Sequence, residues 1–166
     1  MKTAIIYSFK TTRTRAVAEA IAVGVSGLSP EMIDIDNVHP EVLFNYDLII
    51  AGVPTWFDGE LPFYWDEWMP ELETLDLTGK KVAVFGLGDQ LKYPENFADA
   101  VGIFADFAGK LGAEIVGKTS IEGFSFNSSK AVRGNQFLGL VLDDDNQPEL
   151  TANRIENWCS ALVEKM

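Results

Sequence analysis

Three short segments of the sequence carry side chains that could bind a flat, phosphorylated ligand. Thr11, Thr12 and Thr14 place hydroxyl groups at the start of a segment of helical composition, and Trp56 and Tyr93 supply aromatic rings in two later loops. Hydroxyl groups beside the free N–H groups of a helix N-terminus suit a phosphate dianion. Two aromatic faces on either side of a slot suit a planar conjugated ring. Together they predict a site for a mononucleotide cofactor with a planar head group.

The threonines also have a purely structural interpretation, and the histidine and cysteine content argues against catalytic and metal sites. Threonine is a common N-cap, so Thr11 or Thr12 could simply cap the helix that follows. The single histidine, His39, lies beside Pro40 in a polar-flanked connection, so we do not expect a serine–histidine–acid triad, and the single cysteine, Cys159, leaves no internal disulfide or thiolate metal cluster. We therefore predict no catalytic residue and no metal ligand, and we expect Cys159 to be a buried structural thiol.

The elements that must position these residues alternate between strand and helix patterns. The near-continuous apolar run at 48–53 is typical of a strand buried on both faces, and Pro54 should end it because proline has no N–H to donate to a sheet. We expect this run to be the central strand. Trp56 then lies at the carboxyl edge of the sheet, where ligands of open α/β sheets bind.

The remaining segments predict one α/β domain over residues 1–166, with a parallel sheet covered on both faces. Further strands are expected at 3–7, 32–35, 80–86, 114–117 and 137–142, the last two separated by a polar stretch. Helices are expected at 15–23, 63–72, 97–108 and 151–163, with Asn96 and Thr151 as N-caps of the last two.

The charge balance is strongly acidic. The chain has 25 acidic and 13 basic residues, a formal net charge of −12, which would repel nucleic acids and anionic membranes. No apolar run approaches the roughly 20 residues of a membrane span, and no signal-peptide core follows the first residues. We expect a cytoplasmic monomer, with acidic side chains available to dock basic partner proteins.

Four motifs make the chain resemble a long-chain flavodoxin over essentially its whole length, most closely the second, less typical flavodoxins of proteobacteria. The resemblance implies a three-layer, doubly wound fold with a five-stranded parallel sheet of order 2-1-3-4-5 and an interrupted last strand. It also implies noncovalent FMN and low-potential transfer of single electrons, without enzymatic activity. The motifs are Pro54-Thr55-Trp56 with Gly59-Glu60; Phe85-Gly86-Leu87-Gly88-Asp89-Gln90 with Tyr93 and Asn96-Phe97; Gly123-Phe124 with Phe126 and Ser129-Lys130; and Gly139-Leu140 with Leu142-Asp143 and Asp145-Asn146-Gln147.

The resemblance further implies which residues surround FMN. Trp56 and Tyr93 would sandwich the isoalloxazine ring, while Thr55 and Asp145 would lie near the ribityl chain. Backbone groups around Gly88-Asp89 and Asn96 would meet the pyrimidine edge, and a carbonyl in Asp58-Gly59 would face flavin N5. The predicted cofactor-binding residues are Phe9, Lys10, Thr11, Thr12, Arg13, Thr14, Pro54, Thr55, Trp56, Asp58, Gly59, Leu87, Gly88, Asp89, Tyr93, Asn96, Phe97 and Asp145.

The phosphate loop departs from the family pattern Thr/Ser-x-Thr-Gly-x-Thr. Phe9 lacks the first hydroxyl, and Thr12 replaces the glycine. If that position needs a positive φ, Thr12 is strained by on the order of 1–3 kcal/mol. Lys10 and Arg13 could add positive charge. We expect FMN to bind, with a smaller contribution from its phosphate than an intact loop would give.

The partners implied by the resemblance are a basic-faced reductase of the flavodoxin/ferredoxin-NADP reductase type and acceptor redox enzymes. Asp58, Glu60 and Asp89 would steer such partners and disfavour extra negative charge on the flavin. One alternative is an FMN-free interaction protein whose phosphate loop has diverged. A flavin-dependent quinone reductase is disfavoured, because Trp56 and Tyr93 would cover both ring faces and leave no place for a second substrate.

Overall fold

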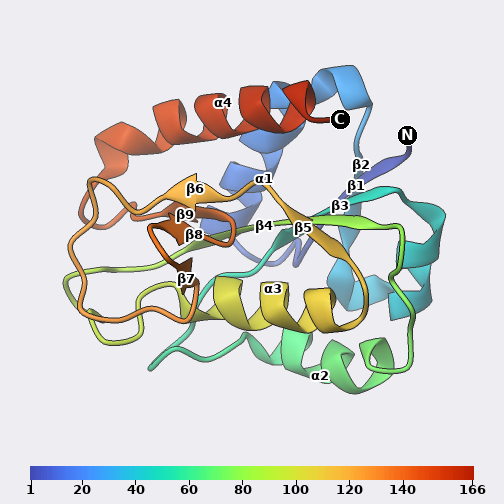
Figure 1. Ribbon diagram of the computed structural model, residues 1–166, viewed down its shortest axis with the longest axis horizontal. Coiled ribbons are helices and arrows are strands. Elements are labelled where there is room, and N and C mark those ends of the chain that lie inside the picture. Colours follow the sequence, from blue (N-terminus) through green and yellow to red (C-terminus); the bar gives the residue numbers. More distant parts are fainter.

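A parallel sheet with helices on both faces forms the frame of the computed structural model, which describes residues 1–166 (Figure 1). The sheet order is β2-β1-β3-β4-β5, which confirms the predicted order 2-1-3-4-5 and the central place of the run at 48–53. All neighbouring strands are parallel. The strands are β1 (Thr3–Tyr7), β2 (Glu31–Asp34), β3 (Leu48–Gly52), β4 (Lys81–Leu87) and β5 (Glu114–Val116).

Two hydrophobic cores lie on the two faces of this sheet. Every residue of β1 and β3 is buried, as expected for apolar runs covered on both sides. One core packs the sheet against α2 (Phe63–Leu72) and α3 (Asp99–Lys110), and the other packs it against α1 (Arg13–Gly24) and α4 (Pro148–Glu164). Cys159 lies in the second core, where burial raises the pKa of its thiol to about 11. None of the helices is long and apolar enough to span a membrane.

The interrupted last strand is confirmed. β5 pairs with the first part of β4, at 81–83, and β9 (Leu140–Leu142) pairs in parallel with its end, at 85–87. The intervening chain forms a separate antiparallel sheet of order β6-β8-β7. Its strands are β6 (Thr119–Ser120), β7 (Val132–Arg133) and β8 (Gln136–Phe137). β9 thereby delivers the following acidic loop to the carboxyl edge of the sheet.

The aromatic side chains of α2 anchor the chain that follows β3. Tyr64, Trp65 and Trp68 are buried, which supports the expectation that they belong to the core, whereas Phe63 is exposed. The Trp65 indole donates a hydrogen bond of 2.9 Å to the carbonyl of Gly52, the last residue of β3. This bond fixes α2 under the end of β3 and so restricts the loop at 53–62.

Three helix starts differ from the prediction. α1 begins at Arg13, two residues earlier than expected, and Thr12 occupies the N-cap position without a side-chain cap hydrogen bond. α3 begins at Asp99 after Ala98, whose φ is 54°, so Asn96 does not cap it. Instead the Thr55 hydroxyl, from a distant loop, accepts from the Ala100 N–H.

The prediction for the last helix was also wrong at its start. α4 begins at Pro148, a residue type favoured in the first helical turn, and its N-cap is Gln147. Thr151 therefore lies inside the helix, and its hydroxyl donates to the Asp144 carboxylate. A side-chain hydrogen bond to the preceding loop thus replaces the expected cap.

Candidate cofactor site

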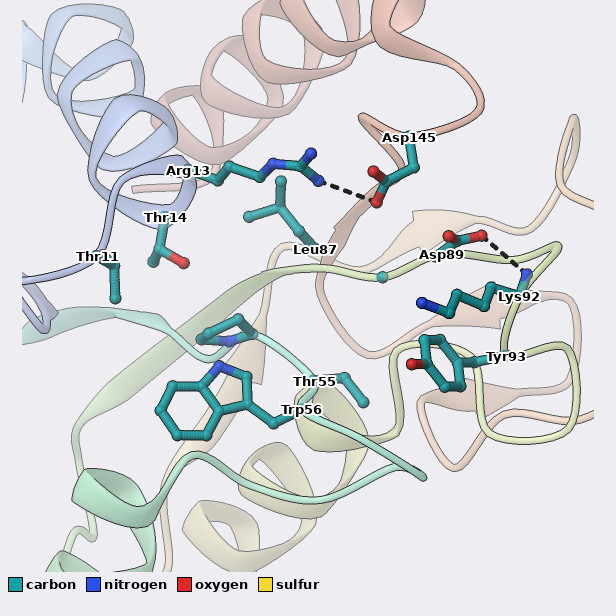
Figure 2. Close-up of a pocket in the computed structure, with 12 residues that line it drawn as sticks. Thr11, Arg13, Thr14, Thr55, Trp56, Leu87, Asp89, Lys92, Tyr93 and Asp145 are labelled. Atoms are coloured by element: carbon teal, nitrogen blue, oxygen red, sulfur yellow. Dashed lines mark hydrogen bonds and ion pairs between the residues drawn. The ribbon is translucent and has the colours of Figure 1, made fainter.

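A cavity of about 370 Å³ lies where the loops after β1, β3 and β4 meet the loop between β9 and α4 (Figure 2). Its volume is within the range of small-molecule sites in proteins. All four loops leave the carboxyl ends of parallel strands, which is why segments far apart in the sequence converge there. The lining residues are Thr11, Arg13, Thr14, Pro54, Thr55, Trp56, Leu87, Gly88, Asp89, Lys92, Tyr93 and Asp145.

Every lining residue except Lys92 is among the predicted cofactor-binding residues. Lys92 was missed because a lone lysine in a loop carries no spacing signal; its Nζ lies 5.4 Å from the centroid of the Tyr93 ring. The other predicted residues lie outside the lining. These are Phe9, Lys10, Thr12, Asp58, Gly59, Asn96 and Phe97. The Phe9 ring packs on Tyr7, and the side chains of Lys10, Thr12 and Asp58 are exposed. Asn96 is half-buried, and Gly59 and Phe97 are buried.

The α1 end of the cavity presents unused hydrogen-bond donors. The backbone N–H groups of residues 12–15 have no acceptor within the protein, because they belong to the first turn of α1. Thr14 is buried, and its hydroxyl also makes no hydrogen bond within the protein; the Thr11 hydroxyl donates to the Ser8 carbonyl at 2.7 Å. This end therefore suits an anion with several oxygen acceptors.

Thr12 fits this turn without the strain considered above. Its φ of −94° and ψ of −55° lie in the right-handed helical region, and no residue from 9 to 14 has a positive φ. A β-branched residue adopts this conformation readily. The structure thus removes the strain-based reason for expecting a weakened phosphate loop, although Phe9 still supplies no hydroxyl.

An ion pair crosses the cavity near this end. The Arg13 Nη1 donates to Asp145 Oδ2 at 2.9 Å, and both side chains are partly exposed (Figure 2). The hydrogen bond and the charge of Asp145 raise the pKa of Arg13 above its ordinary value. Lys10 is also near a carboxylate, with its Nζ 3.7 Å from Asp36 Oδ1. The side chains of Arg13 and Lys10 thus each lie beside a carboxylate.

The aromatic end is formed by Trp56 and Tyr93. The backbone of Trp56 pairs with Glu60 in both directions, at 2.9 and 2.8 Å, which closes a tight turn at 57–59. The Trp56 ring packs against Phe63 and Tyr64, each with a centroid separation of 5.6 Å. Trp56 is therefore held by its own turn and by α2, while Tyr93 comes from the loop between β4 and α3.

The turn at 57–59 favours glycine at position 59. The φ of Gly59 is +88°, and an added Cβ would lie 2.9 Å from both Asn96 Cβ and Asp99 Oδ2. We expect Gly59→Ala to lower the free energy of unfolding by about 2–4 kcal/mol, from backbone strain plus steric overlap. Gly79→Ala is the matched control, because Gly79 has a φ of +82° with no atom near its missing Cβ. Equal losses in urea unfolding of the two variants would contradict the steric contribution.

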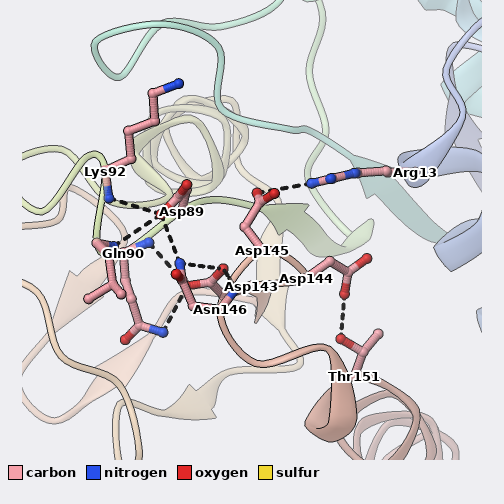
Figure 3. Close-up of polar contacts among 10 residues, drawn as sticks. Arg13, Asp89, Gln90, Lys92, Asp143, Asp144, Asp145, Asn146 and Thr151 are labelled. Carbon is pink, nitrogen blue, oxygen red and sulfur yellow. Dashed lines mark hydrogen bonds and ion pairs between the residues drawn. The ribbon is translucent and has the colours of Figure 1, made fainter.

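A buried carboxylate connects two of the loops that line the cavity (Figure 3). Asp143 is fully buried and accepts from the backbone N–H and side-chain amide of Gln90, at 3.1 and 2.8 Å. It also accepts from the Asn146 N–H at 3.0 Å, and the Asn146 amide donates to Asp89 Oδ1 at 2.8 Å. The loop that carries Tyr93 is thereby fastened to the loop that carries Asp145.

The carboxylate of Asp89 is turned into its own loop. Burial acts to raise its pKa, but hydrogen bonds from the Lys92 N–H, the Asn146 amide and the Leu91 N–H outweigh burial and leave the pKa below its ordinary value. Asp89 is therefore negatively charged at neutral pH. Its charge helps to order the loop beside the cavity.

Comparison with known proteins gives one consistent result. The family model described as Flavodoxin matches residues 5–158. The flavodoxin of Synechococcus elongatus is 46% identical over 162 residues, 97% of this chain and 95% of that protein. Flavodoxin 1 of Escherichia coli is 39% identical over 165 residues, 99% of this chain and 94% of that protein. A crystal structure of Fusobacterium nucleatum flavodoxin bound to flavin mononucleotide superimposes with a TM-score of 0.93 at 30% identity, covering 100% of this chain and 99% of that one.

Proposed function

Because this chain belongs to the flavodoxin family, we propose that it binds FMN noncovalently in the cavity of Figure 2 and carries single electrons at low potential. The observation that carries the proposal is the pairing of two features in one cavity. The start of α1 contributes free N–H donors, and the loops after β3 and β4 contribute the rings of Trp56 and Tyr93. A phosphate and a flat ring on one molecule need this combination. The alternative of an FMN-free interaction protein does not account for it.

We assign the residues of the cavity to parts of FMN. The N–H groups of 12–15 and the Thr14 hydroxyl would hold the phosphate, and the rings of Trp56 and Tyr93 would flank the isoalloxazine. Backbone groups at Gly88, Asp89 and Asn96 would meet the pyrimidine edge, and a carbonyl of Asp58-Gly59 would face N5. Bound FMN supplies the one-electron redox chemistry. The protein contributes stacking, exclusion of water and a negative field.

The proposed partners are a basic-faced reductase and acceptor redox enzymes. Asp58 and Glu60 are exposed on the turn beside Trp56, and Phe57 on the same turn is 70% exposed. Acidic side chains around an apolar tip would attract a basic partner to the cavity mouth. We further propose that the protein is a monomer in the cytoplasm, where such partners would dock at the cavity mouth.

Titration of the apoprotein with FMN, followed by photoreduction, tests the proposed function. We expect tight binding with quenched flavin fluorescence, and reduction in two separate one-electron stages in the visible spectrum. No binding at micromolar FMN would overturn the proposal. Steady quinone turnover with NAD(P)H alone would instead indicate a quinone reductase.

The acidic turn is expected to influence the redox potential. Neutralising it with Asp58→Asn and Glu60→Gln removes two negative charges that disfavour the reduced, more negative flavin. The lower of the two one-electron potentials should rise by on the order of 20–50 mV, because surface charges act through high dielectric. Glu156→Gln with Glu164→Gln on α4 is the control, with the same charge change away from the cavity. A potential equal to that of this control would remove the argument.

A further inference from the structure

We propose that Arg13 exchanges partners when FMN binds, leaving Asp145 for the FMN phosphate, and that this exchange strengthens the preference of the cavity for FMN over riboflavin. The inference rests on the proposed function, because it assumes that FMN enters this cavity. It assigns Asp145 a role as a competitor for Arg13, in place of the predicted contact with the ribityl chain. It also assigns to a charged side chain part of the phosphate recognition in this chain.

The geometry brings the two residues together from distant parts of the sequence. Arg13 is the first residue of α1, and Asp145 lies in the loop before α4, 132 positions later. Both line the cavity, and Figures 2 and 3 show the guanidinium reaching across to the carboxylate. The Arg13 backbone N–H is itself one of the free donors of the first turn. A phosphate held by this turn would therefore lie within the same residue's reach.

The existing ion pair is easy to break. The side chain of Arg13 is 59% exposed and that of Asp145 is 41% exposed. Exposed pairs of this kind stabilise a protein by about 0–1 kcal/mol, since water competes for both partners. Asp145 can be hydrated again when Arg13 leaves it. Breaking the Arg13–Asp145 ion pair therefore costs little free energy.

A phosphate dianion would attract Arg13 more strongly than Asp145 does. It carries up to twice the negative charge of a carboxylate, and its oxygens match the fork of a guanidinium. The charges of Asp143, Asp144 and Asp145 all act on Arg13. Without Arg13, a phosphate at the start of α1 would face this acidic loop with no cation in between. The positive side chain therefore has its largest effect on the phosphate-bound state.

The test compares FMN with riboflavin, which lacks only the phosphate. The ratio of their dissociation constants isolates the phosphate, because contacts to the ring and ribityl chain cancel. Arg13→Gln should reduce the preference for FMN about tenfold, the value of one charge-assisted contact, and leave riboflavin binding unchanged. Asp145→Asn should increase that preference about threefold, because it removes the competing charge. Raising the salt concentration should lower the preference in the native protein more than in Arg13→Gln.

Arg133→Gln is the matched control. Arg133 lies on β7 outside the cavity lining, is exposed and pairs with Asp106, so this variant makes the same change in net charge. Equal preferences in Arg13→Gln and Arg133→Gln would overturn the exchange, as would a lower preference in Asp145→Asn. Failure of both flavins to bind the native apoprotein would instead reject the proposed function. Circular dichroism confirms that each variant is folded.

Discussion

Replacing Asp143 with alanine should lower the free energy of unfolding by about 3–5 kcal/mol, because it leaves several buried donors without an acceptor. Asp143 is fully buried, and Gln90 is 3% exposed. The Gln90 backbone N–H and side-chain amide both donate to the Asp143 carboxylate. Water cannot reach these groups unless the loops open. Loss of the Asp143 carboxylate therefore destabilises both the loop of Gln90 and the loop before α4.

Urea unfolding of Asp143→Ala, Asp143→Asn and Asp144→Ala measures this effect. Asp143→Asn keeps one acceptor oxygen and should lose about half as much stability as the alanine variant. Asp144 is less buried and makes one side-chain hydrogen bond, to Thr151, so its alanine variant should lose less than about 1 kcal/mol. Equal losses at positions 143 and 144 would contradict the role of Asp143 as the buried hub. The hub also holds the loop of Tyr93, so Asp143→Ala should weaken flavin binding.

The frame of the fold could be predicted because its signals are local. The apolar run at 48–53 and the proline after it specify a buried strand and its end without reference to any other segment. The segment 63–72 likewise has a helical pattern along its whole length, and α2 has the predicted bounds. The helix starts were less predictable, because their hydrogen bonds come from elsewhere. The acceptor of the Ala100 N–H is Thr55, 45 positions earlier.

The cavity shows the same division between local and distant information. The aromatic and hydroxyl residues follow predicted strands directly, so their place at one sheet edge follows from the parallel topology. The pairing of Arg13 with Asp145 and the acceptor role of Asp143 join loops more than 50 positions apart, and no spacing encodes them. The conformation of Thr12 also needed the structure, because its residue type fits a helix as well as a strained turn.

Trp56→Ala should weaken binding of FMN and riboflavin by the same factor, about 30- to 150-fold, or roughly 2–3 kcal/mol. An indole against one face of the flavin buries apolar area on both rings, and alanine cannot replace it. The ring is held by Phe63 and Tyr64, so it is already in place before a ligand binds. Equal losses for the two flavins are expected because FMN and riboflavin share the ring on which Trp56 would stack, and the uncharged indole has no group that recognises the phosphate.

Phe63→Ala is the control for this experiment. Phe63 is 60% exposed, touches the Trp56 ring and does not line the cavity. If its removal weakens both flavins as much as Trp56→Ala does, the loss reflects support of the turn, and the stacking role is rejected. If Trp56→Ala weakens FMN alone, the indole acts through the phosphate, and the stacking role is likewise rejected. Fluorescence titration of both apoproteins with both flavins therefore separates stacking at the aromatic end from charge at the α1 end.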